Sequence, residues 1–319
     1  MMFYVYMQPE VITVAQNGGP YAVQALISFL RGAVQNCCLV EFLDDRTRAA
    51  IRDYMDAFPA AFDRKLLKSL LSSLQKRNRF LYVLEPDYTS IRSDLEVVLA
   101  AVADLQTDLV LCESQAEITN PGTEVCELAT YQNTNFAHQR FQLAGEGKTL
   151  AEGELGQQDY LDEYWSKVFR FASRIEICDH ILGRQFGSNF EYSLRALFHW
   201  LEGILDNPGG CSLIMHVGVP DKASLEYIRT QLTAYKQGAL LAMRIEIHTY
   251  DLDDGRPCLP HERFILTDQI AVEIGRGMDF LDSATHRIRD VSLGYKSPKE
   301  VTDLLASYAA YKQLPVTIL

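Results

Sequence analysis

The sequence from Leu259 to Gly277 is LPHERFILTDQIAVEIGRG, and its pattern predicts a β-hairpin. Phe264–Thr267 and Ile270–Ile274 are short runs of residues that favour β-strands. Asp268–Gln269 lies between the two runs, where the chain has to turn. We therefore interpret Asp268 as a turn residue rather than as a catalytic group.

His261 and Arg263 stand two residues apart where the first predicted strand begins. Side chains at positions i and i+2 of a strand point to the same face, so we expect this pair to share one side of the sheet. A guanidinium group holds two phosphate oxygens in a planar fork, and an imidazole attacks phosphorus or transfers a proton. The pair therefore predicts a phosphate site.

The spacing of His261, Arg263, Asp268 and Gly275 resembles the HxK(x)4D(x)6G signature of the phospholipase D superfamily, with Arg in the place of Lys. The resemblance covers roughly residues 173–296 and includes a single copy of the motif. The predicted order of elements in this region is strand, helix, strand, helix, strand, hairpin, strand, helix. That order is similar to one half of a phospholipase D-like fold.

The sequence departs from the superfamily just after the glycine. Arg276 and Met278 stand where the family has Ser and Asn, which removes two groups of the family's phosphate site. The run from Ile274 to Asp279 also resembles the phospholipase D-like domain at the C-terminus of MIT-domain proteins. That second resemblance implies binding rather than catalysis.

The superfamily resemblance implies a specific chemistry. His261 would attack phosphorus to give a phosphohistidine, Arg263 would hold the nonbridging oxygens, and Asp290 would orient the histidine. A second histidine protonates the leaving oxygen in this family, so a chain with one motif is expected to form a homodimer. The resemblance also implies a phosphate-binding segment formed by Gly275, Arg276 and Gly277, where the glycines allow close backbone approach.

Other histidines and acids lie near predicted strand ends. Asp179 and His180 follow the strand 174–179 and are candidate walls of the same site, the alternative being a helix cap beside a surface histidine. His216 and His248, near the ends of neighbouring strands, are interpreted as structural.

Strands and helices alternate along the chain, which predicts an α/β fold with a largely parallel sheet in the N-terminal half. We expect an N-terminal α/β domain over residues 1–118, a connecting segment over 119–159 and a phospholipase D-like α/β domain over 160–319. Within these, residues 11–15 are expected to form a short strand and residues 124–136 a helix.

The predicted N-terminal strands end in acids, namely Asp44, Asp45, Glu85, Asp87 and Glu113. Ligands bind at the carboxyl ends of parallel strands, and converging carboxylates hold Mg²⁺, an arrangement similar to that of PIN-like nucleases. Helix capping by Asp explains the same positions. The seven cysteines form no CxxC pair, so we expect buried reduced thiols, no metal site and no cofactor.

The formal net charge of −12 argues against a broad nucleic-acid-binding surface, since phosphate neutralisation dominates that affinity. The densest basic group comprises Arg64, Lys65, Lys68, Lys76, Arg77 and Arg79. It is either a local nucleic-acid patch or a solvated helix face. The sequence shows no membrane span and no secretory signal, so a cytoplasmic location is expected.

Two functions follow from these observations. The first is a phosphodiesterase acting as a homodimer, most simply a nuclease, which the family resemblance associates with bacterial defence. The intact His261 favours it. The second is a noncatalytic module that binds phosphate groups, lipid headgroups or a protein partner. The missing Ser and Asn, the Arg in place of Lys and the acidic charge favour the second.

Overall fold

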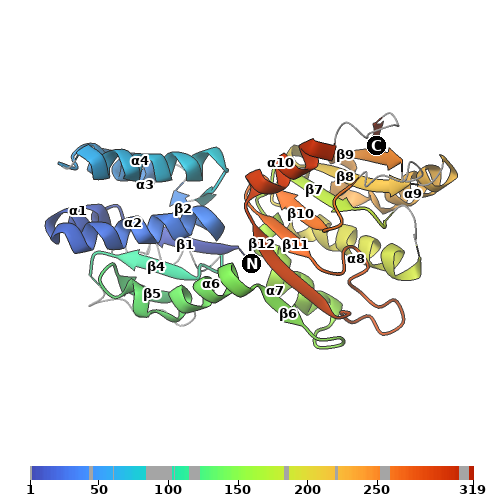
Figure 1. Ribbon diagram of the computed structural model, residues 1–319, viewed down its shortest axis with the longest axis horizontal. Coiled ribbons are helices and arrows are strands. Elements are labelled where there is room, and N and C mark those ends of the chain that lie inside the picture. The colour runs from blue at the N-terminus through green and yellow to red at the C-terminus, as the bar shows by residue number, and fades with distance from the viewer. Residues whose placement is uncertain are drawn as a thin grey trace. The chain divides into compact units, whose positions relative to one another are not determined.

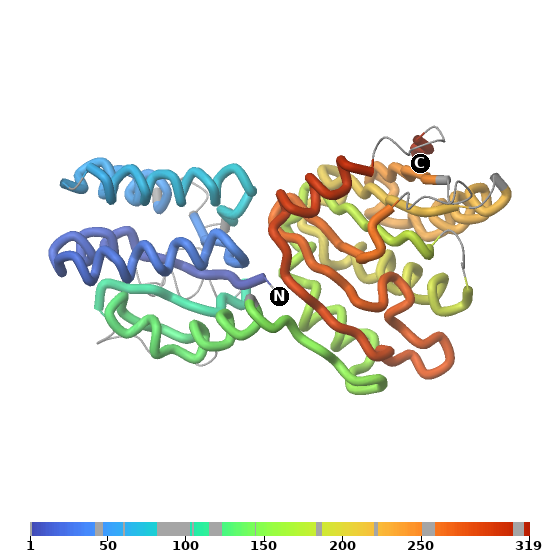
Figure 2. The backbone as a smooth tube through the Cα atoms, in the orientation of Figure 1, coloured from blue at the N-terminus to red at the C-terminus, as the bar shows by residue number. Residues whose placement is uncertain are grey.

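The computed structural model describes residues 2–42, 46–59, 61–83, 103, 105–114, 123–182, 187–219, 222–251, 259–308 and 316–319. The chain forms two compact units, Met2–Gly145 and Glu146–Leu319. Figure 2 traces them as consecutive parts of the chain, the first from blue to green and the second from green to red. Their boundary lies inside the range 119–159, where the connection between domains was expected.

The first unit is built on a parallel sheet with the strand order β3-β2-β1-β4-β5 (Figure 1). Its elements are β1 (Phe3–Met7), α1 (Glu10–Asn17), α2 (Gly19–Asn36), β2 (Cys37–Phe42), α3 (Arg46–Asp56), α4 (Ala61–Lys76), β3 (Phe80–Val83), β4 (Leu109–Cys112), β5 (Glu124–Glu127), a 3-10 turn (Tyr131–Asn133) and α6 (Asn135–Glu146). Every residue of the central strand β1 is buried, as expected of a parallel strand covered on both faces.

Aromatic side chains join the helices of this unit to its sheet. Phe3 on β1 contacts Phe136 on α6 edge to face, with ring centroids 5.2 Å apart. Phe29 on α2 contacts Tyr131 in the same way at 5.1 Å. These pairs hold α2 and α6 against the core, and edge-to-face packing is worth about 0.5–1.5 kcal/mol per pair beyond area burial.

The second unit is built on a mixed sheet with the order β13-β9-β8-β7-β10-β11-β12-β6. Its elements are β6 (Lys148–Leu150), α7 (Gln157–Phe169), β7 (Arg174–Asp179), α8 (Ser188–Ile204), β8 (Ser212–Val219), α9 (Lys222–Tyr235), β9 (Arg244–Asp251), β10 (Phe264–Thr267), β11 (Ala271–Ile274), β12 (Val291–Lys296), α10 (Pro298–Tyr308) and β13 (Thr317–Ile318). Strands β7, β8 and β9 are parallel, and β10, β11 and β12 continue the sheet in antiparallel pairs.

Helices cover both faces of the second sheet. Val301 and Leu305 of α10 pack on one face, in a buried cluster with Phe264 and Leu266 of β10. Helices α7 and α8 lie on the opposite side (Figure 1). Ile175 and Ile177, the alternate residues of β7, are also buried, so both faces of this strand are covered.

The α/β fold class is confirmed, and the predicted hairpin forms as β10 and β11 with Asp268 in its turn. Two local predictions are wrong. Residues 11–15 belong to helix α1, whose buried residues Val11, Ile12 and Ala15 follow helical spacing. The expected helix over 124–136 is instead strand β5, which pairs with β4, followed by a 3-10 turn and the start of α6. The outcome for Cys258, one of the seven cysteines expected to be buried, lies outside the described residues.

Candidate phosphate-binding site

The predicted site residues come together at one end of the second sheet. Phe264 pairs with Cys178, so the residue before it, Arg263, stands beside Asp179 at the end of β7. On the other side of β10, the amide of Ile274 donates to the carbonyl of Arg263 (2.8 Å). The ends of β7 and β11 and the start of β10 therefore meet at Arg263.

Arg263 is held on both sides. Its Nη1 donates to the carbonyl oxygen of Gly275 (2.7 Å), and its Nε lies 3.7 Å from the Asp179 carboxylate. Its side chain is 18% exposed. Among the described residues, Nη2 of Arg263 has no hydrogen-bond or ion-pair partner, which leaves that part of the fork available to a ligand.

Asp179 is fully buried and connects three segments. Its carboxylate accepts the backbone N–H groups of Met278 (2.8 Å) and Ile181 (2.9 Å), besides facing Arg263. Burial raises the pKa of Asp179 above its ordinary value, while these hydrogen bonds and the Arg263 charge oppose the shift. The side chain thus does more than line the site, because it fixes the loop after β11 and the arginine together.

Gly277 and Gly275 pack where a side chain does not fit. Gly277 has a φ of +82°, and a Cβ there would overlap Cδ of Arg263 and Oδ2 of Asp179. A Cβ at Gly275 would overlap Oγ of Ser292 on β12. The absence of a side chain at the two glycines therefore allows the loop after β11 to pack directly against Arg263, Asp179 and Ser292.

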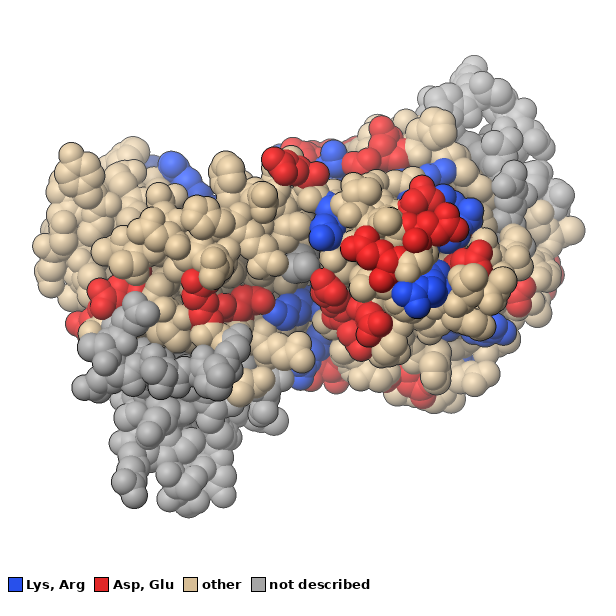
Figure 3. All heavy atoms as spheres, turned by 90° about the horizontal axis from the view of Figure 1, so that it is seen from below, with Lys and Arg blue, Asp and Glu red and all other residues tan. Residues whose placement is uncertain are grey.

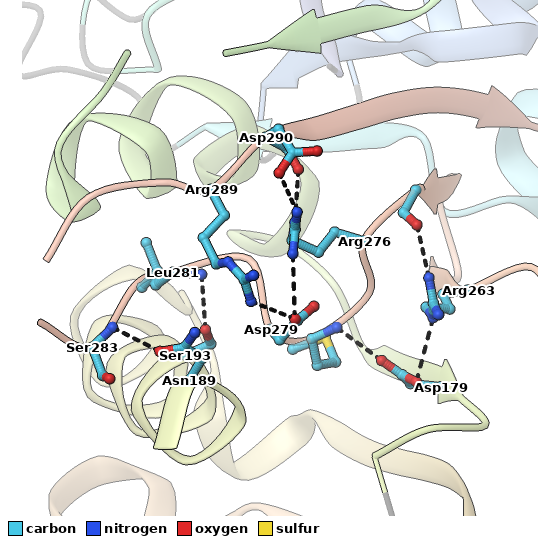
Figure 4. A network of polar contacts seen from close by, with 12 residues as sticks. Asp179, Asn189, Ser193, Arg263, Arg276, Asp279, Leu281, Ser283, Arg289 and Asp290 are labelled. Atoms are coloured by element: carbon cyan, nitrogen blue, oxygen red, sulfur yellow. Dashed lines mark hydrogen bonds and ion pairs between the residues drawn. The ribbon is translucent and has the colours of Figure 1, made fainter. Parts of the chain in front are cut away.

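Arg276 belongs to a second charged network (Figure 4). Its Nε donates to the carbonyl of Asp290 (2.9 Å), its Nη2 pairs with the Asp290 carboxylate, and its Nη1 lies 3.6 Å from Asp279. Arg289 donates to the same Asp279 oxygen (2.7 Å). The structure thus joins Asp290 to Arg276, whereas the family resemblance assigns it to the orientation of His261.

A pocket of about 490 Å³ opens between these groups. Its walls are formed by Thr149, Ile181, Phe190, Arg263, Gly275, Arg276, Asp279, Asp290, Val291 and Ser292. The two arginines lie at the open end of the hairpin, Arg263 just before β10 and Arg276 just after β11, and Gly275 also lines the pocket. The lining contains two cations, Arg263 and Arg276, and two carboxylates, Asp279 and Asp290, so its formal charge is balanced before any ligand binds.

His261 lies outside the lining of this pocket. It is exposed, and its ring contacts the His180 ring edge to face, with centroids 4.8 Å apart. In an in-line displacement, one imidazole attacks phosphorus and a second imidazole protonates the leaving oxygen on the opposite side. The phosphate therefore lies between the two rings, and each ring is roughly 3 Å from the atom with which it reacts. Two rings in direct contact leave no room for a phosphate between them.

Helix α8 holds the loop that forms the far wall of the pocket. The backbone N–H of Leu281 donates to Ser193 Oγ (2.9 Å), and that of Ser283 donates to Asn189 Oδ1 (2.9 Å). Sequence reasoning missed these positioning residues, and it also missed Asp279, Arg289 and Ser292. For the last three, the signal was available in the charged and polar residues that follow the motif, namely Asp279 shortly after it and Arg289 and Ser292 around the start of β12.

His216 and His248 lie elsewhere. His216 pairs in register with Cys178, and His248 pairs with His216, so both belong to the face of the sheet opposite to that of Asp179. His216 is buried between Glu176 (2.9 Å) and the hydroxyl of Tyr250 (3.1 Å). They do not line the arginine pocket.

The acids expected at the first unit's strand ends are mostly beyond the described residues, which include Glu113 but not Asp44, Asp45, Glu85 or Asp87. Within the described chain, no cluster of three or more His, Cys, Asp or Glu side chains suits a metal ion. The six described cysteines are buried thiols, and burial raises the pKa of Cys37 to about 12.

Comparison with known proteins gives no family for this chain: no family model matches it, and no curated protein matches it. None of the described helices has the length and apolar character needed to cross a membrane. The cytoplasmic location stays a prediction. The chemistry of the pocket is therefore inferred from its own contacts.

Proposed function

We propose that the second unit is a phospholipase D-like domain whose pocket binds a phosphate group. One observation carries the proposal: Arg263 and Arg276 bring guanidinium groups to the same pocket from the two strands at the open end of the β10–β11 hairpin. Guanidinium groups recognise phosphate oxygens through paired, charge-assisted hydrogen bonds. The backbone of Gly275 between them leaves the space that a tetrahedral anion requires.

The two arginines have different roles in this proposal. Arg263 is held by the buried Asp179, and breaking a buried ion pair is costly, so it stays fixed. Arg276 is paired with Asp290, whose side chain is 65% exposed. An exposed ion pair is worth about 0–1 kcal/mol, so a phosphate can replace the Asp290 carboxylate at little cost. In this proposal, the guanidinium group of Arg276 releases the Asp290 carboxylate and binds the phosphate of the ligand in its place.

Calorimetric titration of the full chain with thymidine 5′-monophosphate, and with thymidine as the uncharged control, tests this binding. We expect the nucleotide to bind and thymidine to bind at least tenfold more weakly. Arg276→Gln should weaken nucleotide binding about tenfold, because hydrogen bonds to charged groups contribute about 1.5–3 kcal/mol. Arg244→Gln, an exposed arginine of β9 outside the pocket, should leave it unchanged. Equal binding by both variants would overturn the proposal.

A phosphodiesterase activity, most simply that of a nuclease, is the second proposal. The exposed position of His261, two residues before the fixed Arg263, supports it. A nitrogen of His261 would form a bond to phosphorus while the bond to the leaving oxygen breaks, and water would then hydrolyse the phosphohistidine. Because His180 touches His261, the proton donor for the leaving oxygen would be His261 of a second copy, which requires a homodimer.

Cleavage assays separate the two proposals. Single- and double-stranded DNA and RNA are incubated with the full chain, with and without EDTA, beside His261→Ala. Metal-independent cleavage that is lost in the variant, by a protein whose mass in solution is that of a dimer, supports the phosphodiesterase. Cleavage abolished by EDTA but retained in the variant would assign it to the first unit. Nucleotide binding without cleavage leaves the phosphate-binding module, whose ligand would be a phosphate compound, a lipid headgroup or a modified protein.

A further inference from the structure

Positive charge is concentrated in one segment of this acidic chain. Residues 46–79 contain nine Lys or Arg and three Asp or Glu, a formal net charge of +6, whereas the whole chain carries −12. Counting the preceding Asp44 and Asp45 still leaves the segment at +4. The segment forms the helix pair α3 and α4 and the turn before β3, all within the first unit (Figure 1).

Several of these cations already have structural roles. Arg79 is fully buried and donates to the carbonyls of Ala33, Gln35 and Cys37 at the end of α2. Arg77 donates to the carbonyl of Val34 (2.8 Å). These two close the C-terminus of α2, so neither is available to a ligand.

Other cations face solvent. Arg52 on α3 and Lys65 and Lys76 on α4 are exposed, and none of them has a hydrogen bond or ion pair with any described residue. Lys68, also exposed, pairs with Asp56. Lys65 and Lys68 lie on successive turns of α4, which presents them side by side. The charge excess of the segment is therefore at the surface.

A recess of about 230 Å³ lies between the two helices. It is lined by Arg48, Arg52, Met55, Lys68, Leu71, Ser72, Gln75 and Phe80. Arg48 and Arg52 are one helical turn apart on α3, and Lys68 faces them from α4. Of the three cations, Arg48 is also bound to the buried Glu41 (3.4 Å). The recess is large enough for a phosphate group and is cationic on two sides.

An exposed aromatic side chain lies on α4, outside the lining of this recess. Phe62, near the start of α4, is 79% exposed and lies one turn before Lys65. An exposed phenyl ring next to cations is the combination that single-stranded nucleic acids use, with phosphates on the cations and bases stacked on the ring.

We infer that the face formed by Arg52, Phe62, Lys65 and Lys68 on α3 and α4 binds a single-stranded nucleic acid. The net negative charge of the chain does not prevent this. The Debye length is about 8 Å at physiological ionic strength, so acids farther away are largely screened. On the face drawn in Figure 3, by contrast, the described acidic and basic side chains of the second unit are interspersed. This surface is separate from the arginine pocket and does not depend on the function proposed for it.

Fluorescence anisotropy of a labelled 20-nucleotide oligo-dT with the full chain, over a series of salt concentrations, tests the inference. Arg52→Gln/Lys65→Gln removes two unpaired cations without touching the fold. For single strands, the slope of log affinity against log salt is about −0.7 per phosphate contact, so the variant slope should be shallower by about 1.4. Arg229→Gln/Lys299→Gln, which removes two exposed cations of α9 and α10, should keep the original slope.

Phe62→Ala provides a second readout, because it leaves the charge unchanged. Base stacking on an aromatic is worth about 1–3 kcal/mol, so we expect binding roughly fivefold weaker or more with an unaltered salt slope. Phe62→Ala should bind thymidine 5′-monophosphate as the original protein does, because Phe62 is not part of the arginine pocket, and this separates the surface from that pocket. Failure of the original protein to bind oligo-dT, an unchanged slope in the Arg52/Lys65 variant, or binding only to phosphatidylserine vesicles would overturn the inference.

Discussion

Gly277 shows how a single backbone conformation determines the geometry of the pocket. Its φ of +82° turns the chain so that Met278 can donate to Asp179, and its missing side chain makes room for Arg263. Left-handed backbone costs a residue with a Cβ about 1–2 kcal/mol, and here the Cβ also meets a buried ion pair. The glycine is required by the site as much as by the turn.

We therefore expect Gly277→Ala to destabilise the protein by about 2–3 kcal/mol and to weaken nucleotide binding by displacing Arg263. The matched control is Gly203→Ala in α8, where an added Cβ meets nothing within 4 Å. That variant should be neutral or slightly more stable, since alanine favours helices. Urea denaturation and calorimetric titration measure the two effects. Similar stabilities for the two variants would disprove this role of Gly277.

The raised pKa of Asp179 predicts how the stability of the protein depends on pH. Burial raises its pKa in the folded protein above the ordinary value near 3.8. A carboxyl group with a raised pKa favours folding fully below its unfolded pKa, and that contribution is lost as the pH rises through the folded pKa. Asp179→Asn cannot ionise, so it should gain stability relative to the original protein as the pH rises from about 4 to about 7.

Urea denaturation of both proteins across this pH range gives the difference between their unfolding free energies at each pH. The contributions of the other titrating groups are the same in both proteins and cancel in this difference. Asp303→Asn, an exposed acid of α10, should show no such trend. A difference between Asp179→Asn and the original protein that does not change with pH would show that the pKa of Asp179 is not raised.

At the scale of elements, the sequence predicted the second unit better than the first. The strand 174–179 and the first hairpin strand have the predicted bounds, because the β-favouring pattern is clear there. Residues 11–15 were ambiguous, since an apolar run with β-branched residues suits a strand or a buried helix. At β5, pairing with β4 overrode a local helical preference. The sequence of β5 alone does not show that this pairing will form.

Arg79 illustrates an element held by a residue far away in the sequence. It is fully buried, its pKa is lowered to about 10 by burial, and it satisfies three carbonyls at the end of α2. We expect Arg79→Met to destabilise the first unit by about 3 kcal/mol, because buried carbonyls lose charged donors. Arg31→Met, an exposed residue of α2, should cost less than about 0.5 kcal/mol.

Hydrogen exchange measured by mass spectrometry locates the effect of Arg79→Met. Exchange should rise in α2 and β2 and stay unchanged in β7, β8 and β9, because the second unit has its own core. Equal loss of protection in both units would contradict an independent role for this residue.

At the scale of the whole molecule, the prediction of the site depended on the strand register. His261, Arg263, Gly275, Arg276, Asp179, His180 and Asp290 all lie at one end of the second sheet. Spacing alone could not show which of these residues interact. It did not predict that His180 would contact His261, that Asp290 would pair with Arg276, or that the arginine pocket would exclude both histidines. These relations depend on tertiary contacts between segments more than ten residues apart.

The central claim is that Arg276 exchanges the Asp290 carboxylate for a phosphate, and Asp290→Asn tests it most directly. The variant removes the internal anion that competes with the ligand, and measured ion pairs at the surface typically contribute about 0.2–1 kcal/mol. Calorimetric titration with thymidine 5′-monophosphate should therefore show roughly 1.4- to fivefold tighter binding than in the original protein, with Asp303→Asn unchanged. Binding that is unchanged or weaker in Asp290→Asn would contradict the account.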